Sequence, residues 1–98
     1  MTKISQEQKT KIIRLIHAII PDCRIILFGS FARNTQGNGS DIDLALDAKR
    51  KLTISELGEV KGVLENSYLP YSFDIVDIHT ISASMQESIK QEGVIWIE

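Results

Sequence analysis

Residues 28–47 read FGSFARNTQGNGSDIDLALD, and the interpretation of the whole chain starts from this stretch. An apolar run at residues 25–28 stops at Gly29-Ser30. A short polar stretch with two more glycines follows, and from Asp41 onward acidic and apolar residues alternate. We therefore expect a buried strand, a tight turn that opens a short helix, a loop, and a second strand.

The second strand is predicted to present two carboxylates on one face. Side chains alternate along a strand, so Asp41 and Asp43 point to one side while Ile42 and Leu44 point to the other. Two carboxylates held this close repel each other unless a cation or a proton lies between them. Hard oxygen ligands on a rigid strand suit Mg²⁺, which binds one or two protein carboxylates together with substrate phosphates.

The turn before the short helix supplies the other half of the expected site. Gly29 allows the close approach of a phosphate, and Ser30 adds N–H and hydroxyl donors at a helix start. Arg33 lies about one helical turn after Ser30. It either binds the same anion or forms a salt bridge that holds the short helix to the core. Ser40 either contacts the nucleotide or is a simple residue at the start of the second strand.

A third carboxylate is expected from a strand at residues 71–78. Asp74 lies between Phe73 and Ile75, where an acid is costly unless it has a partner. Asp77 lies an odd number of residues further on and is expected to face the opposite side of the sheet. Asp74 is therefore the predicted partner of the other two acids, and the alternative is an edge-strand acid that faces water.

Two short motifs carry a resemblance to a known family, and they read Gly29-Ser30-x-Ala32-Arg33 and Ser40-Asp41-x-Asp43. Together they resemble the signature of nucleotidyltransferases of the DNA polymerase beta superfamily. The short chain is similar to the minimal nucleotidyltransferases, small proteins often paired with a HEPN-domain partner. Asp74 matches the acidic position of the family's third-carboxylate strand. The family commonly has glycine where this chain has Asn34, a residue that tolerates left-handed backbone conformations.

The resemblance implies a Mg²⁺-dependent enzyme that uses a nucleoside triphosphate. The implied catalytic and metal-binding residues, for two Mg²⁺ ions, are Asp41, Asp43 and Asp74. The implied nucleotide-binding residues are Gly29, Ser30, Arg33 and Ser40. The minimal nucleotidyltransferases act as antitoxins that transfer AMP from ATP to a tyrosine hydroxyl of a HEPN ribonuclease. Two alternatives remain open, which are a non-catalytic module that silences its partner by occlusion and a transferase for a small-molecule acceptor.

The remaining elements are expected from helical periodicity and capping patterns. Helices are predicted at residues 5–20, 53–66 and 82–92, the first two opened by capping boxes of the Ser-x-x-Gln and Thr-x-x-Glu type. Gly58 and Gly62 would let the second of these helices pack closely against the sheet. Residues 94–97 would form a last strand at the sheet edge. The expected fold is α+β, a polymerase beta-like nucleotidyltransferase fold with a small mixed sheet and helices mainly on one face.

Length and composition exclude several classes of protein. The chain of 98 residues is expected to be a single domain, residues 1–98, with an ordinary globular composition of 43% hydrophobic residues. A net charge of −2 gives no electrostatic reason to bind nucleic acid. The single cysteine excludes an intramolecular disulfide and a cysteine-based metal cluster. The sequence shows neither a membrane span nor a signal peptide, so we expect a cytoplasmic protein; its oligomeric state is left open.

Overall fold

The computed structural model describes residues 3–37, 39 and 41–97. Its core is a four-stranded sheet in the order β3-β2-β1-β4. Strand β1 pairs antiparallel with β2 and β4, whereas β2 and β3 are parallel, so the sheet is mixed. The elements are α1 (Gln6–Ile19), β1 (Arg24–Phe28), α2 (Gly29–Arg33), β2 (Ile42–Asp47), α3 (Ile54–Glu65), β3 (Phe73–Asp77), α4 (Ala83–Glu92) and β4 (Val94–Ile97). The predicted α+β fold with a small mixed sheet is confirmed.

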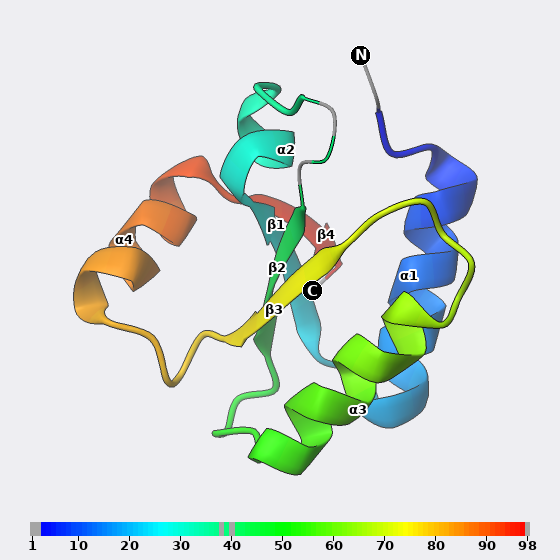
Figure 1. Cartoon of the computed structure of the whole chain (residues 1–98). Coiled ribbons are helices and arrows are strands. Elements are labelled where there is room, and N and C mark those ends of the chain that lie inside the picture. The colour runs from blue at the N-terminus through cyan, green and yellow to red at the C-terminus, as the bar shows by residue number, and fades with distance from the viewer. Residues whose placement is uncertain (1–2, 38, 40, 98) are drawn as a thin grey trace.

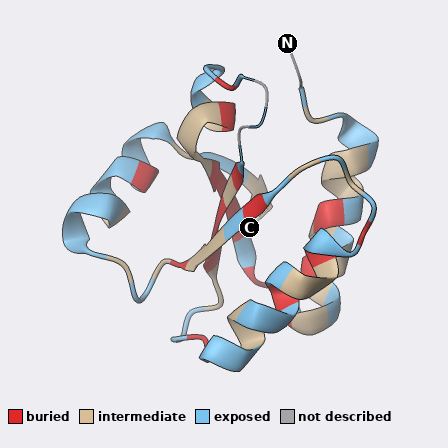
Figure 2. Ribbon diagram, in the orientation of Figure 1, coloured by how far each residue is buried: buried red, intermediate tan, exposed pale blue. Residues whose placement is uncertain are grey.

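Helices α1 and α3 pack side by side on one face of the sheet (Figure 1). Ile42, Leu44 and Leu46 alternate along β2 toward this face and are completely buried. Ile12 and Ile16 of α1 are buried in the same core. Figure 2 shows buried positions along the strands and on the sides of α1 and α3 that are turned toward the sheet. This face holds most of the hydrophobic core.

Helix α4 packs on the other face of the sheet (Figure 1). Its buried residue Ile89 joins Ile26 of β1 and Ala45 of β2 in a smaller apolar cluster. The short helix α2 lies at the end of β1, at the top of Figure 1. Helices therefore lie mainly on the face of α1 and α3, as predicted. Helix α4 lies on the other face, to which some of the acidic residues of the strands also point.

Both predicted capping boxes are present. The Ser5 hydroxyl accepts a hydrogen bond from the Gln8 N–H at 3.0 Å, and the Gln8 side chain accepts one from the Ser5 N–H at 3.0 Å. Thr53 and Glu56 form the same reciprocal pair at the start of α3. Each box satisfies N–H groups that have no partner inside the helix. Helices α1 and α3 begin and end within one residue of the predicted bounds.

The expectation that Gly58 and Gly62 bring α3 close to the sheet is wrong. A Cβ atom built at either glycine would meet no atom within 4 Å. The contact of α3 with the core is made instead by Val60 and Leu64, which are buried. The two glycines therefore weaken the helix without improving its packing.

Two further expectations concern the C-terminal half of the chain. Strand β3 begins at Phe73, two residues later than predicted, and β4 forms at the edge of the sheet at the predicted residues.

Among the described residues, no helix combines the length and the apolar character that crossing a membrane requires.

Candidate active site

Asp43 and Asp74 are direct neighbours on the two parallel strands. The register of β2 and β3 pairs Asp43 with Asp74, and residues so paired lie about 4.8 Å apart between strands. Both side chains alternate with the core residues Leu44 and Ile75, so they lie on the face opposite to α1 and α3. Asp74 is exposed and Asp43 is half-buried. The tertiary structure thus brings together two of the three predicted acids.

The carboxylates influence one another electrostatically. Burial raises the pKa of the Asp43 carboxyl, and the negative charges of Asp74 and Asp41 raise it further, while Arg33 has the opposite effect. Asp41 is exposed and comes one residue before β2. Within the described part of the chain, no three carboxylate, histidine or cysteine side chains are placed to hold one metal ion together.

The residues nevertheless fit a divalent cation by their chemistry. Asp43 and Asp74 offer hard oxygen donors from two rigid strands, and Asp41 adds a third acid close enough to raise the pKa of Asp43. Such oxygen donors suit Mg²⁺. A bound cation would also remove the mutual repulsion that raises the pKa of Asp43.

Gly29 lies directly against the Asp43 carboxylate. β1 ends at Phe28, which pairs with Asp43 in the sheet, and the chain turns at once into α2. Gly29 has φ +72°, and a Cβ atom at this position would collide with the Asp43 side chain. Glycine is therefore required here for its backbone conformation and for space. This contact joins the predicted turn and the predicted acidic strand into one site.

Arg33 lies at the end of α2 and points toward α4. Asn34 then ends the helix in the left-handed conformation, with φ 59°, and its N–H donates to the Ser30 carbonyl oxygen. The asparagine thus adopts the conformation that glycine would provide in the family pattern. Arg33 Nη1 donates a hydrogen bond to Glu92 Oε2 at 3.1 Å, so a salt bridge to α4 is formed. Ser40, the remaining predicted nucleotide contact, lies outside the described residues.

A cleft of about 370 Å³ opens between α2 and α4. Gly29 and Arg33 line one side, and Met85, Ile89 and Glu92 line the other. The cleft therefore combines the backbone of the turn, one guanidinium group and an apolar wall. Glu92 was not foreseen from the sequence, because nothing local connects it with Arg33; the one signal is an acid in the last turn of a predicted helix.

Asp77 has a structural role, as its predicted orientation implies. It is 1% exposed, on the α1 and α3 face of the sheet. Its carboxylate accepts hydrogen bonds from the Leu52 N–H at 2.7 Å and the His79 N–H at 3.0 Å. These contacts hold the segment before α3 against the end of β3. Asp77 is thus separated from Asp74 by the sheet.

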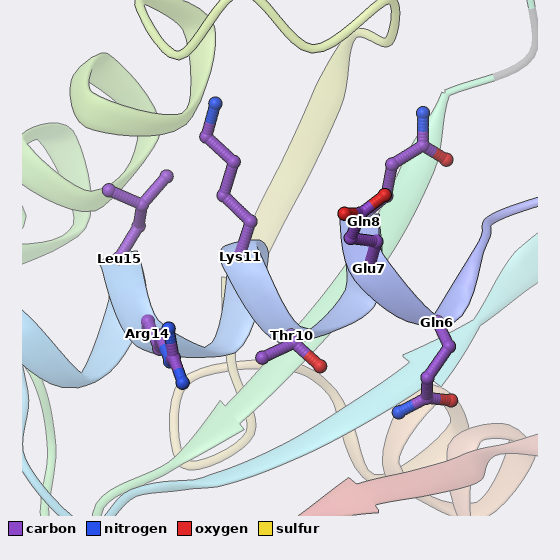
Figure 3. Close-up of a pocket in the computed structure, with 7 residues that line it drawn as sticks. All are labelled: Gln6, Glu7, Gln8, Thr10, Lys11, Arg14 and Leu15. Carbon is purple, nitrogen blue, oxygen red and sulfur yellow. The ribbon is translucent and has the colours of Figure 1, made fainter.

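Another surface depression runs along α1 (Figure 3). Its lining, which includes Thr10, Lys11, Arg14 and Leu15, comes entirely from this helix. A wall from a single helix leaves the depression open. Moreover, α1 packs on the face opposite to Asp43 and Asp74. The depression is therefore separate from the candidate active site.

Comparisons with known proteins show similarity to nucleotidyltransferases. The family model described as polymerase beta, nucleotidyltransferase matches residues 7–98. The protein adenylyltransferase MntA of Shewanella oneidensis is 32% identical over 91 residues, covering 92% of this chain and 65% of the relative. The probable protein adenylyltransferase MntA of Haemophilus influenzae is 26% identical over 92 residues, covering 94% of this chain and 81% of the relative. The chain thus spans just under two thirds of the length of the Shewanella oneidensis relative.

Solved structures show the same fold. A crystal structure of a toxin–antitoxin with AMP-PNP has a TM-score of 0.80 and 32% sequence identity, covering 90% of this chain and 71% of the matched one. The structure of a tri-AMPylated Shewanella oneidensis HEPN toxin in complex with its MNT antitoxin has a TM-score of 0.74 and 29% identity, covering 93% and 70%. With the family model matching nearly the whole sequence, this chain belongs to the polymerase beta family of nucleotidyltransferases.

Proposed function

We propose that this protein transfers AMP from ATP to a hydroxyl group of a HEPN-domain partner, and thereby acts as the antitoxin of that partner. The observation that carries the proposal is the pairing of Asp43 with Asp74 beside Gly29. The relatives support the nature of the reaction, since they are described as protein adenylyltransferases, and one similar complex contains an AMPylated HEPN toxin.

In the proposed reaction, the turn and the acidic strands have separate tasks. Gly29 and Ser30 contact the triphosphate through N–H groups and a hydroxyl, and Arg33 adds positive charge from the cleft. Asp74 accepts the proton of the attacking hydroxyl. The hydroxyl oxygen bonds to the α-phosphorus while the bond to the bridging oxygen of the β-phosphate breaks, and pyrophosphate leaves. Asp41, Asp43 and Asp74 would hold two Mg²⁺ ions, and these ions would supply charge stabilisation for the attacking and leaving oxygens.

The acceptor is proposed to be a protein because the relatives are described as protein adenylyltransferases and one similar complex contains an AMPylated HEPN toxin. The cleft beside Gly29 has about 370 Å³, at the lower end of the volumes of small-molecule sites. A protein acceptor brings its own binding surface. We propose a cytoplasmic location for this reaction, where ATP is available.

The deciding experiment is mass spectrometry of a HEPN-domain partner incubated with this protein, ATP and Mg²⁺. We expect the wild type to add AMP units and Asp41→Asn, Asp43→Asn and Asp74→Asn to add none. Asp47→Asn is the matched control, since Asp47 lies on the same face of β2 but at its far end, hydrogen-bonded to His79 at 2.7 Å. A stable complex without AMP transfer would replace the proposal with occlusion. Neither complex nor transfer would favour a small-molecule acceptor.

A further inference from the structure

Glu92 and Arg33 join two helices that flank the cleft beside Gly29. The hydrogen bond between Arg33 Nη1 and Glu92 Oε2 is 3.1 Å long and connects residues 59 positions apart. The two side chains are 49% and 47% exposed, and ion pairs this open to water contribute little to folding stability. Stability alone therefore does not account for the pair.

The place of Glu92 on its own helix is electrostatically unfavourable. The C-terminal end of a helix carries a partial negative charge, which attracts cations and repels acids. Lys90, in the same last turn of α4, follows this preference, whereas Glu92 opposes it. The guanidinium of Arg33, which Glu92 contacts directly, offsets this repulsion.

The backbone of Glu92 is held firmly against the strand that leads into the active site. The next residue, Gly93, donates its N–H to the Ile89 carbonyl oxygen at 2.7 Å. A Cβ at Gly93 would collide with that carbonyl, so this tight exit from α4 requires glycine. β4 then pairs with β1 from Val94 opposite Leu27. The backbone at Glu92 is therefore held near the end of β1, where the turn at Gly29 begins.

The pair leaves most of the guanidinium donors available. A guanidinium carries five N–H donors in a planar arrangement. In the described part of the structure, the one hydrogen bond that the Arg33 guanidinium donates goes through Nη1 to Glu92. A guanidinium held along one edge can bind an anion with its other edge. That anion would lie in the cleft that both side chains and Gly29 line.

We propose that Glu92 is a positioning residue that orients Arg33 toward the phosphates of a nucleoside triphosphate in the cleft between α2 and α4. The inference rests on the proposed function only for the identity of this ligand. Glu92 itself does not touch the nucleotide. It restricts the conformations of the long Arg33 side chain before binding, so less conformational entropy is lost when the phosphate binds.

The test compares Glu92→Gln and Glu92→Asp with Glu87→Gln, a control on the exposed part of the same helix outside the cleft. Binding of AMP-PNP with Mg²⁺ is measured by calorimetry on the full chain, and KM for ATP and kcat are measured with the HEPN partner. We expect Glu92→Gln to weaken AMP-PNP binding and to raise KM roughly 3- to 10-fold, because the long Arg33 side chain would then lose its conformational freedom only on binding. We expect kcat to stay within about twofold, Glu92→Asp to recover part of the loss, and Glu87→Gln to match the wild type.

An Arg33→Gln background completes the experiment. If Glu92 acts through Arg33, adding Glu92→Gln to Arg33→Gln causes no further loss of AMP-PNP affinity. Three results overturn the proposal, which are an equal loss of affinity in both backgrounds, an unchanged affinity, and tighter binding by Glu92→Gln. Tighter binding would mean that Glu92 competes with phosphate for Arg33. Because AMP-PNP binding is measured without an acceptor, its result stands even if no AMP transfer is found, which would overturn only the proposed function.

Discussion

Gly29 and Asp43 are in such close contact that no side chain fits between them. A Cβ at Gly29 would overlap the Asp43 carboxylate, and the φ of +72° at Gly29 is one that other residues rarely adopt. The end of β1 and the middle of the acidic strand are therefore fixed relative to each other by one residue without a side chain.

Replacing Gly29 with alanine tests this contact. We expect Gly29→Ala to lower the free energy of unfolding by roughly 1–3 kcal/mol, because the strained backbone conformation and the collision both oppose folding. AMP transfer should fall as well, since Asp43 must move. Urea denaturation and the mass-spectrometric assay measure the two effects.

Gly58→Ala is the control for Gly29→Ala. Gly58 is in the exposed interior of α3 and its Cβ would meet no atom within 4 Å, so alanine should stabilise the protein by about 0.5–1 kcal/mol. Equal destabilisation by both substitutions would show that the contact between Gly29 and Asp43 is not what constrains position 29.

Asp74 and Asp77 should respond in opposite ways to substitution. Asp74→Asn removes an exposed acid at the active site, so we expect a loss of AMP transfer of roughly 100-fold or more with nearly unchanged stability. Asp77→Ala leaves one buried and one partly buried N–H group without their acceptor, which should cost about 2–4 kcal/mol. Activity per folded molecule of Asp77→Ala should stay close to that of the wild type, as checked by kinetics and urea denaturation. Loss of AMP transfer by Asp77→Ala at temperatures where this variant is folded would contradict these roles.

The pH dependence of stability should differ between Asp43 and Asp47. Burial, followed by the charges of Asp74 and Asp41, raises the pKa of Asp43, so its ionised form destabilises the fold. This penalty is complete above the raised pKa and disappears as the pH falls through it. Without divalent cations, Asp43→Asn should therefore be more stable than the wild type at pH 7, and this difference should vanish in acid.

Asp47→Asn should show the opposite sign. Burial acts to raise the pKa of Asp47, but hydrogen bonds from the Lys49 N–H and from His79 bring the net pKa below its usual range. A depressed carboxyl pKa contributes stability above the unfolded-state pKa, and this contribution is lost as the pH falls through the folded-state pKa. Thermal unfolding of the three proteins between pH 3 and pH 7 (about the range over which carboxyl groups titrate) measures both effects. Curves with the same sign would contradict the assigned environments.

Mg²⁺ should stabilise the wild type through the acidic pair. At a concentration about 100 times its Kd, a ligand that binds only the folded state adds about 2.7 kcal/mol. We expect Mg²⁺ to raise the thermal midpoint of the wild type and of Asp47→Asn, and to have little effect on Asp43→Asn or Asp74→Asn. The same increase in all four proteins would place the Mg²⁺ elsewhere.

The orientation of the strand acids was largely predictable because a strand alternates its side chains strictly. The period of two orients Asp43 away from Leu44, and it assigns Asp74 and Asp77 to opposite faces of β3 without any tertiary information. The capping boxes at Ser5 and Thr53 were equally readable, because their hydrogen bonds connect residues three positions apart. The prediction that Gly58 and Gly62 bring α3 close to the sheet was wrong, because the spacing of residues along a helix does not encode how closely that helix packs.

By itself, the sequence determined the order of the helices and strands, their bounds to within about two residues, the faces to which Asp43, Asp74 and Asp77 point, and the family to which the motifs belong. These are local properties, set by backbone periodicity and by contacts within one helical turn. Only the tertiary structure decided that β2 and β3 are parallel neighbours with Asp43 opposite Asp74, that Gly29 lies on the Asp43 carboxylate, and that Glu92 faces Arg33. Such relationships depend on how distant segments pack, and hydrophobic burial, which drives that packing, is not directional.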